Sequence, residues 1–235
     1  MNKFKRGLLA LVLSFCAVNP LNAEYLYKDE VISNPKLTEE VEAMGKELHE
    51  KTGIALRLVV IKELDENQTI VDYEKSLIKN FNEPTILLTF SEMNKKVDIL
   101  ARPESLYKYF DKKQVLSPTA TGLQAFFMAV FFSSSFEDFK NNVTDYGGTI
   151  IPLLAEKAKG ADIINKYSAA LFNGYADIAE QIASSKKIKL DTAVGNSNRY
   201  VIEVLKIIFY AFILSGVYMY LKRRLYLRKN KNEKK

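Results

Sequence analysis

Few side chains in this chain are available for catalysis. It holds one histidine, His49, and one cysteine, Cys16, in 235 residues. Cys16 lies in an apolar N-terminal stretch that we expect to be removed, so the remaining chain cannot build a Cys-His couple or a His/Cys zinc site. A Ser-His-Asp triad would have to use His49, which we interpret as a partly exposed surface residue on a helix. No phosphate-binding glycine loop, G-x-S-x-G motif or EF-hand loop is present. The remaining candidates for chemistry are side chains with oxygen atoms, above all carboxylates.

Five carboxylates are predicted to gather at one edge of a sheet. They are Asp29, Glu30, Asp65, Glu66 and Glu92. The first pair precedes an expected helix, the second pair follows the next strand, and the last residue follows a further strand. The helix, about 16 residues at about 1.5 Å each, and the strand, about eight residues at about 3.3 Å each, have nearly equal lengths. Since a tight turn joins them antiparallel, the helix begins where the strand ends, and a parallel second strand would end there too.

Clustered carboxylates suit a hard cation, so this edge is a candidate site for Ca²⁺ or Mg²⁺. The same residues also fit a solvated acidic rim without a bound metal, and the sequence leaves both interpretations open. A cation held by Asp29, Asp65 and Glu66 could polarise a phosphate oxygen, so a cation-dependent phosphatase is one hypothesis for function. No catalytic residue can be named, and whether the chain is an enzyme stays open.

Asn67-Gln68-Thr69 forms an Asn-x-Thr sequence with an acidic residue, Asp65, two positions upstream. This pattern resembles the extended acceptor of bacterial periplasmic N-glycosylation, and an expected loop at this place suits modification. The alternative is a chance match in which Thr69 caps the following helix. Asn67 is therefore a candidate glycosylation site.

The apolar pattern of the first half predicts an α/β fold. Helical spacing begins after Asn34, a suitable cap, and stops at Gly53. The near-continuous apolar run that follows predicts a strand covered on both faces. The expected elements are a helix at 35–52, strands at 54–61, 85–90 and 96–101, and a helix at 70–81. We expect a small central sheet, made from a β-α-β unit plus a hairpin and sandwiched by helices.

The second half is expected to be helical. The intensely apolar segment Gly122–Phe132 is too short to cross a bilayer, so we expect a buried core helix. The alternative is a patch that faces a membrane or a partner. The residues of that patch would be Phe126, Phe127, Phe131 and Phe132. A clean apolar stripe between Ile163 and Ile182 predicts a further core helix.

The two ends of the chain carry signals for location. Residues 1–23 have a basic start, an apolar core and small residues near Ala23, as in a secretory signal peptide. The alternative is an uncleaved first transmembrane helix. Residues 200–221 are almost entirely apolar and long enough to span a bilayer, and the basic residues of 222–235 favour a cytoplasmic tail. Between them we expect a domain at 24–184 and a polar tether at 185–199.

The formal net charge of +6 divides unevenly along the chain. Three positive charges lie in the expected signal peptide and a net seven in the tail, so the exported part is mildly acidic. A basic balance of this origin reflects topology and does not indicate nucleic-acid binding.

Several segments, in order, resemble the TPM domains, which are named after a thylakoid lumen protein, a photosystem II repair protein and an acetylcholine-receptor accessory protein. The resemblance covers most of residues 25–184. The segments that carry it are Tyr27-Lys28-Asp29, Leu37-Thr38-Glu39-Glu40, Lys51-Thr52-Gly53-Ile54, Ile150-Ile151-Pro152 and residues 167–174. Two places depart from the family pattern, at residues 81–84 and 102–106, where this chain lacks the usual glycine-containing stretches.

The resemblance implies an α/β sandwich, export, frequent membrane tethering and roles in maintaining membrane protein complexes. It also implies divalent-cation binding and acid phosphatase activity for some members. We therefore expect a single-pass protein of a bacterial inner membrane, with its N-terminal domain in the periplasm and its C-terminus in the cytoplasm. Its expected role is an accessory or maintenance factor for a membrane protein or envelope complex. An acid phosphatase that needs a divalent cation and a module that contacts the lipid bilayer are the alternatives.

Overall fold

The computed structural model describes residues 24–193 and 197–232, and in the second range the side chains of residues 207–224 and 226. The expected signal peptide lies outside these residues. The chain divides into two compact units, residues 1–192 and 193–235, and each is described here by itself. The first unit ends at Thr192, and the expected domain at 24–184 lies within it.

The first unit is built on a four-stranded mixed sheet in the order β1-β2-β3-β4. Its strands are β1 (Leu26–Asp29), β2 (Ala55–Ile61), β3 (Thr85–Ser91) and β4 (Lys96–Arg102). β1, β2 and β3 run parallel, and β4 pairs antiparallel with β3. Every residue of β2 and β3 is buried, which confirms the prediction of a sheet covered on both faces. The predicted α/β class is thus confirmed, and β1 is an additional edge strand that the sequence pattern did not indicate.

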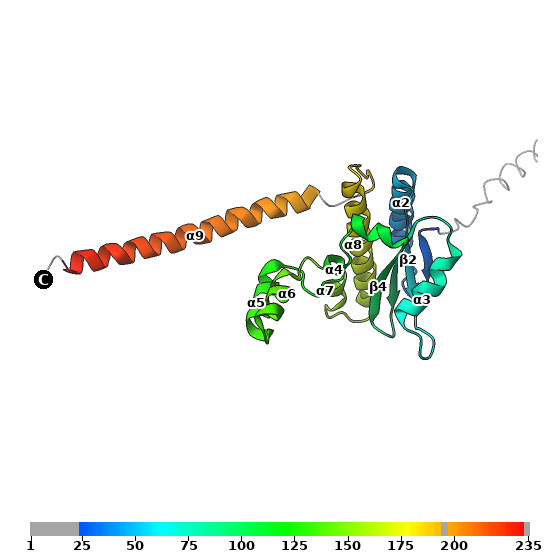
Figure 1. Ribbon diagram of the computed structural model, residues 1–235, viewed down its shortest axis with the longest axis horizontal. Helices are drawn as coiled ribbons and strands as arrows, with labels where there is room; N and C mark the ends of the chain where they lie inside the picture. Colours follow the sequence, from blue (N-terminus) through cyan, green and yellow to red (C-terminus); the bar gives the residue numbers. More distant parts are fainter. Residues whose placement is uncertain (1–23, 194–196, 233–235) are drawn as a thin grey trace, which may run out of the picture. The chain divides into compact units, whose positions relative to one another are not determined.

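Two long helices cover one face of the sheet. α2 (Pro35–Thr52) begins at Asn34, whose side chain accepts from the Lys36 amide, and ends at Gly53 in the left-handed conformation. Asn34 and Gly53 therefore act as predicted. α8 (Asp162–Ser185) packs beside α2 (Figure 1), and the Tyr175 hydroxyl donates to the Leu56 carbonyl oxygen at 2.8 Å.

The other face is covered by α3 (Ile70–Leu77), which continues into the 3₁₀ turn η1 (Ile78–Asn80). This helix packs on β4 and β3, and Figure 1 shows it on the far side of the sheet from α8. α3 and η1 contribute Ile70 and Ile78 to a buried apolar cluster on this side of the sheet. The other members of the cluster are Val59, Ile61, Leu64 and Leu87. The sheet is therefore the middle layer of three, as the sequence predicts.

Short helices connect β4 to α8. They are η2 (Glu104–Tyr109), α4 (Lys112–Val115), α5 (Gly122–Phe132), α6 (Phe136–Thr144) and α7 (Ile151–Leu154). α5 and α6 pair into a helical hairpin, which projects from the side of the domain away from the sheet (Figure 1). We call residues 122–144 the apolar hairpin.

The second unit contains one helix, α9 (Ser197–Asn232). Its large apolar side chains between Ile207 and Leu221 are between 47% and 81% exposed. Among the residues that the structure describes, no helix is both long and apolar enough to cross a membrane.

Candidate functional site

The parallel strands bring their carboxyl ends to one edge, as the sequence predicts. Asp29 ends β1 and pairs in register with Val60 of β2. Glu92 follows β3, and its amide donates to the Ile61 carbonyl oxygen at 3.0 Å. The backbone geometry behind the predicted carboxylate cluster is therefore present.

The side chains at this edge do not converge on a common point. Asp29 turns toward its own loop and accepts hydrogen bonds from the amides of Val31, Ile32 and Ser33, at 2.7 to 3.1 Å. Glu30 pairs with Lys28 at 2.7 Å and accepts from the Lys62 amide, and both contacts lower the pKa of Glu30. These two carboxylates hold the ends of β1 and β2 in place.

A depression of about 460 Å³ opens at the same edge, lined by eight residues. Of the five predicted ligands only Glu30 and Asp65 line it, together with Lys28 and Tyr73; Asp29, Glu66 and Glu92 do not. A lysine beside two carboxylates competes with a cation for them. In the described part of the chain, no group of three or more His, Cys, Asp or Glu residues is arranged to hold a metal ion. The Ca²⁺ or Mg²⁺ site stays a prediction.

Asn67 lies in an exposed turn between β2 and α3, with a φ of 64°. The loop predicted for glycosylation is therefore accessible. Thr69 is the N-cap of α3, because its hydroxyl accepts from the Asp72 amide at 3.1 Å. The predicted capping role of Thr69 is confirmed, and glycosylation of Asn67 stays a prediction.

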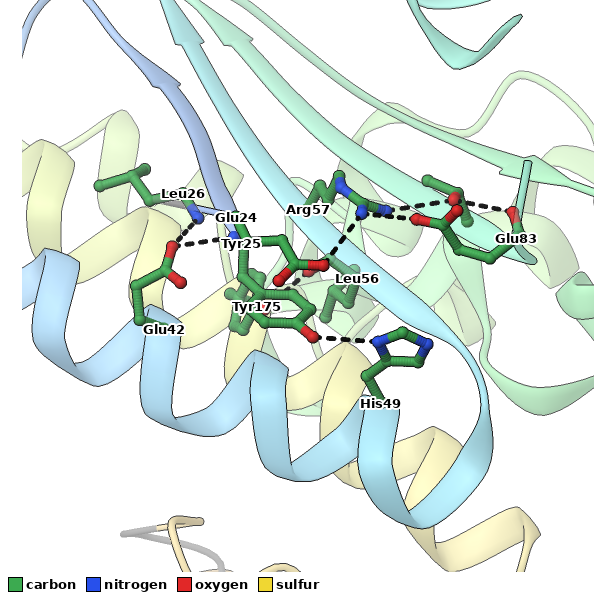
Figure 2. Close-up of polar contacts among 10 residues, drawn as sticks. Glu24, Tyr25, Leu26, Glu42, His49, Leu56, Arg57, Glu83 and Tyr175 are labelled. Carbon is green, nitrogen blue, oxygen red and sulfur yellow. Dashed lines mark hydrogen bonds and ion pairs between the residues drawn. The ribbon is translucent and has the colours of Figure 1, made fainter. Parts of the chain in front are cut away.

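The single histidine, His49, contacts the tyrosine that precedes β1. The Tyr25 hydroxyl lies 3.0 Å from Nδ1 of His49, as Figure 2 shows, and His49 is half-buried. Glu42, on the same helix, accepts from the amides of Tyr25 and Leu26 at 2.8 and 2.7 Å. These contacts fasten the segment before β1 to α2, which agrees with the interpretation of His49 as a partly exposed surface residue.

Arg57 is a buried charge within the apolar strand β2. It is 4% exposed, forms an ion pair with Glu83 at 2.6 Å and donates to the Thr85 hydroxyl at 3.2 Å (Figure 2). Its guanidinium also lies 4.2 Å from the centre of the Phe81 ring. Buried arginines need such partners because an unpaired charge is costly away from water. This cluster was not predicted from the sequence, although an arginine within the otherwise apolar run of residues 54–61 was a visible signal.

Glu74 is a second buried charge that the sequence analysis missed. Its side chain is fully buried on the inward face of α3, next to Thr89 and Asp98, but neither carboxyl oxygen makes a hydrogen bond of regular geometry. Burial raises the pKa of Glu74 to about 8, and the nearby Asp98, itself paired with Lys112, raises it further. The signal was its position four residues from both Ile70 and Ile78, on the inward face of the helix.

The largest exposed apolar surface of the first unit is on the apolar hairpin. The prediction that Gly122–Phe132 is a buried core helix is wrong, because only Ala125 and Ala129 of α5 are buried. The exposed residues are Leu123, Phe126, Phe127, Met128, Val130, Phe131, Phe132 and, on α6, Phe136, with 45% to 84% of each accessible. Periodicity could not separate the two alternatives, since α5 is apolar in most directions. Surfaces of this kind mark sites of interaction.

A polar network holds the base of the apolar hairpin on α8. Asp177, only 7% exposed, accepts from Gln114 at 3.1 Å, from Thr149 at 3.2 Å and from Gln181 at 3.1 Å. The segments on either side of the hairpin are joined by a backbone hydrogen bond from Gly148 to Thr119, at 3.0 Å. The hairpin is therefore fastened to the domain at both of its ends.

Comparisons with models of protein families, with curated proteins and with solved structures gave no match. The resemblance to TPM domains stays an expectation from the sequence. The candidate functional site rests on this chain's own geometry, in which the apolar hairpin is the feature that packing within the domain does not explain.

Proposed function

We propose that this chain is a membrane-anchored accessory factor, whose α/β domain lies outside the cytoplasm and assists a membrane protein or envelope complex. Residues 200–221 form the anchor, and residues 222–235 form the cytoplasmic tail. The observation that carries this proposal is the exposure of the large apolar side chains of α9 between Ile207 and Leu221. Such a surface is unfavourable in water and favourable in hydrocarbon.

The attachment between the domain and this segment is short. Glu47 accepts from the amides of Asp191 and Thr192, at 2.6 and 2.8 Å, so the domain holds the chain as far as Thr192. Residue 200, where the proposed anchor begins, is only eight positions after Thr192 in the sequence. A domain on so short a tether reaches partners in or on the membrane.

The rival phosphatase hypothesis gains no support from the geometry at the sheet edge. Asp29 is occupied by three backbone amides, and Glu30 by Lys28. Asp29 and Glu30 would first have to leave these contacts to hold a metal. The accessory role, suggested by the resemblance to TPM domains, needs no such rearrangement.

Extraction and capture test the proposal in two steps. Membranes that contain the full chain are washed with alkaline carbonate, and a reporter fused after Lys235 identifies the side on which the tail lies. Retention in the membrane with a cytoplasmic reporter is expected. Crosslinking in intact cells, followed by capture through the tail, should then yield the same membrane proteins reproducibly. Release by carbonate, or a reporter active only outside the cell, would refute the anchor.

A further inference from the structure

We propose that the apolar hairpin lies in the interfacial layer of a lipid bilayer, with α5 on the lipid side and α6 on the water side. The inference rests in part on the proposed function, because the anchor brings the domain to the membrane. It goes further by giving the domain a second membrane contact, made by its own surface.

The distribution of apolar side chains around α5 favours lipid over a protein groove. Phe126, Phe127 and Met128 are consecutive and therefore point about 100° apart, yet all three are 45% to 51% exposed. The buried residues Ala125 and Ala129 lie four apart and mark one narrow side. A helix that fits a protein groove needs a single apolar stripe, whereas a helix that is apolar in most directions suits an apolar medium.

α6 is mostly polar beyond its first residue, Phe136, which is 84% exposed and belongs to the same apolar surface as α5. Glu137, Asp138, Lys140 and Asn141 are all exposed. α5 carries no charged residue, and Gln124 is its one polar side chain. A polar helix above an apolar one matches the arrangement of interfacial membrane segments, whose apolar side is buried about 5–10 Å below the headgroups.

The base of the hairpin carries an aromatic residue of the kind found at membrane interfaces. Tyr146 is 49% exposed, and its ring lies close to Gly122 at the start of α5. Tyrosine prefers the headgroup level, where its ring is in apolar surroundings and its hydroxyl meets water, whereas phenylalanine has no polar group to hydrate. The change from phenylalanine on α5 to tyrosine at the base therefore follows the polarity of a bilayer surface.

The chemistry of this contact is apolar rather than electrostatic. The hairpin has two acidic residues, Glu137 and Asp138, and one basic residue, Lys140, so it offers no attraction to anionic headgroups. Contact with zwitterionic phosphatidylcholine should be as good as contact with anionic lipid, and it should persist at high salt.

Tryptophan fluorescence tests this proposal directly, because the chain contains no tryptophan. The full chain carrying Phe131→Trp is reconstituted into phosphatidylcholine vesicles, with and without bromine on the acyl chains. Two matched variants serve as controls, Asn141→Trp on the water side of the hairpin and Met93→Trp in the turn after β3. Met93 is 62% exposed and Phe131 is 73% exposed, so both positions accept a larger ring without disturbing the core.

For Phe131→Trp we expect emission at shorter wavelength and strong quenching by brominated chains, unchanged by high salt. Both controls should emit as water-exposed tryptophan and resist quenching. Emission at longer wavelength without quenching at position 131 would overturn the proposal. So would a shift without quenching, which indicates burial against protein or a second copy of this chain, or quenching that high salt abolishes.

Carbonate extraction of the same vesicles separates this proposal from the proposed function. A chain that is retained but unquenched at position 131 refutes the hairpin contact and leaves the anchor intact. A chain that is released by carbonate but quenched before extraction refutes the anchor and supports the hairpin contact. Release together with absent quenching refutes both.

Discussion

Replacing Glu74 with glutamine should change how the stability of the domain depends on pH. Glu74 is fully buried, its carboxyl oxygens make no hydrogen bond of regular geometry, and burial raises its pKa to about 8, from a usual value of 4.5. The folded state therefore binds a proton that the unfolded state releases above about pH 4.5. The domain loses stability as pH rises from that value to about 8, where the folded state also ionises.

The size of this effect follows from the separation of the two pKa values. Each pH unit between them costs about 1.4 kcal/mol, so wild-type stability should fall by about 4 kcal/mol between pH 5 and pH 8 from this one residue. Glu74→Gln removes that titration. An amide that lacks partners has its own cost of about 1–3 kcal/mol, but this cost is the same at both pH values and cancels in the comparison.

Urea denaturation of residues 24–192, followed by circular dichroism at pH 5, 6.5 and 8, measures the difference. The free energy of unfolding of Glu74→Gln should rise relative to wild type by about 4 kcal/mol across this range. Glu39→Gln, at an exposed position on α2, is the control and should follow the wild type. Parallel curves for wild type and Glu74→Gln would refute the reasoning, since they would mean that Glu74 titrates alike in the folded and unfolded states.

Three further predictions concern other contacts. Burial disfavours the ionised form of Glu47, but hydrogen bonds from Lys51 and from the chain near Thr192 outweigh burial and lower the pKa of Glu47 to about 2. Acidification from about pH 4.5 to 2 should therefore release the end of the domain, which proteolysis would detect as faster cleavage after residue 186. Glu47→Gln should show the same fast cleavage at neutral pH. Gly148→Ala should destabilise the domain by about 1–3 kcal/mol in thermal unfolding, because the new methyl group would collide with the Ser117 carbonyl oxygen, and unchanged stability would contradict this contact. Intact mass of the native protein should exceed the polypeptide mass by a glycan that Asn67→Gln removes, and equal masses would exclude the modification.

The layered core could be predicted from the sequence because its signals are local. Asn34 and Gly53 limit α2 through cap and backbone conformation, which depend on neighbouring residues. The strands at 55–61, 85–91 and 96–102 lie within a residue of their predicted ends. β1 escaped prediction, because a four-residue edge strand with a half-exposed pattern carries little periodic signal.

The functional features were harder to predict because they depend on contacts that only the folded chain makes. The direction of the Asp29 side chain is decided by amides two to four residues ahead, and its distance from other carboxylates could not be read from strand order. The exposure of Phe131 depends on how the base of the hairpin is attached to α8. That attachment is made by Asp177 with Gln114 and Thr149, which are more than 25 positions from it in the sequence. Apolar composition alone does not say whether a helix is buried or exposed.

The placement of α8 bears on how this protein can mature as it is synthesised. The sheet face lined by Leu56 is closed by Tyr175, which is 119 residues later in the chain. A polypeptide that emerges N-terminus first can cover this face with α2 early, but lacks α8 over Leu56 until Tyr175 has been made. Completion of the domain and delivery of α9 thus fall close together in time.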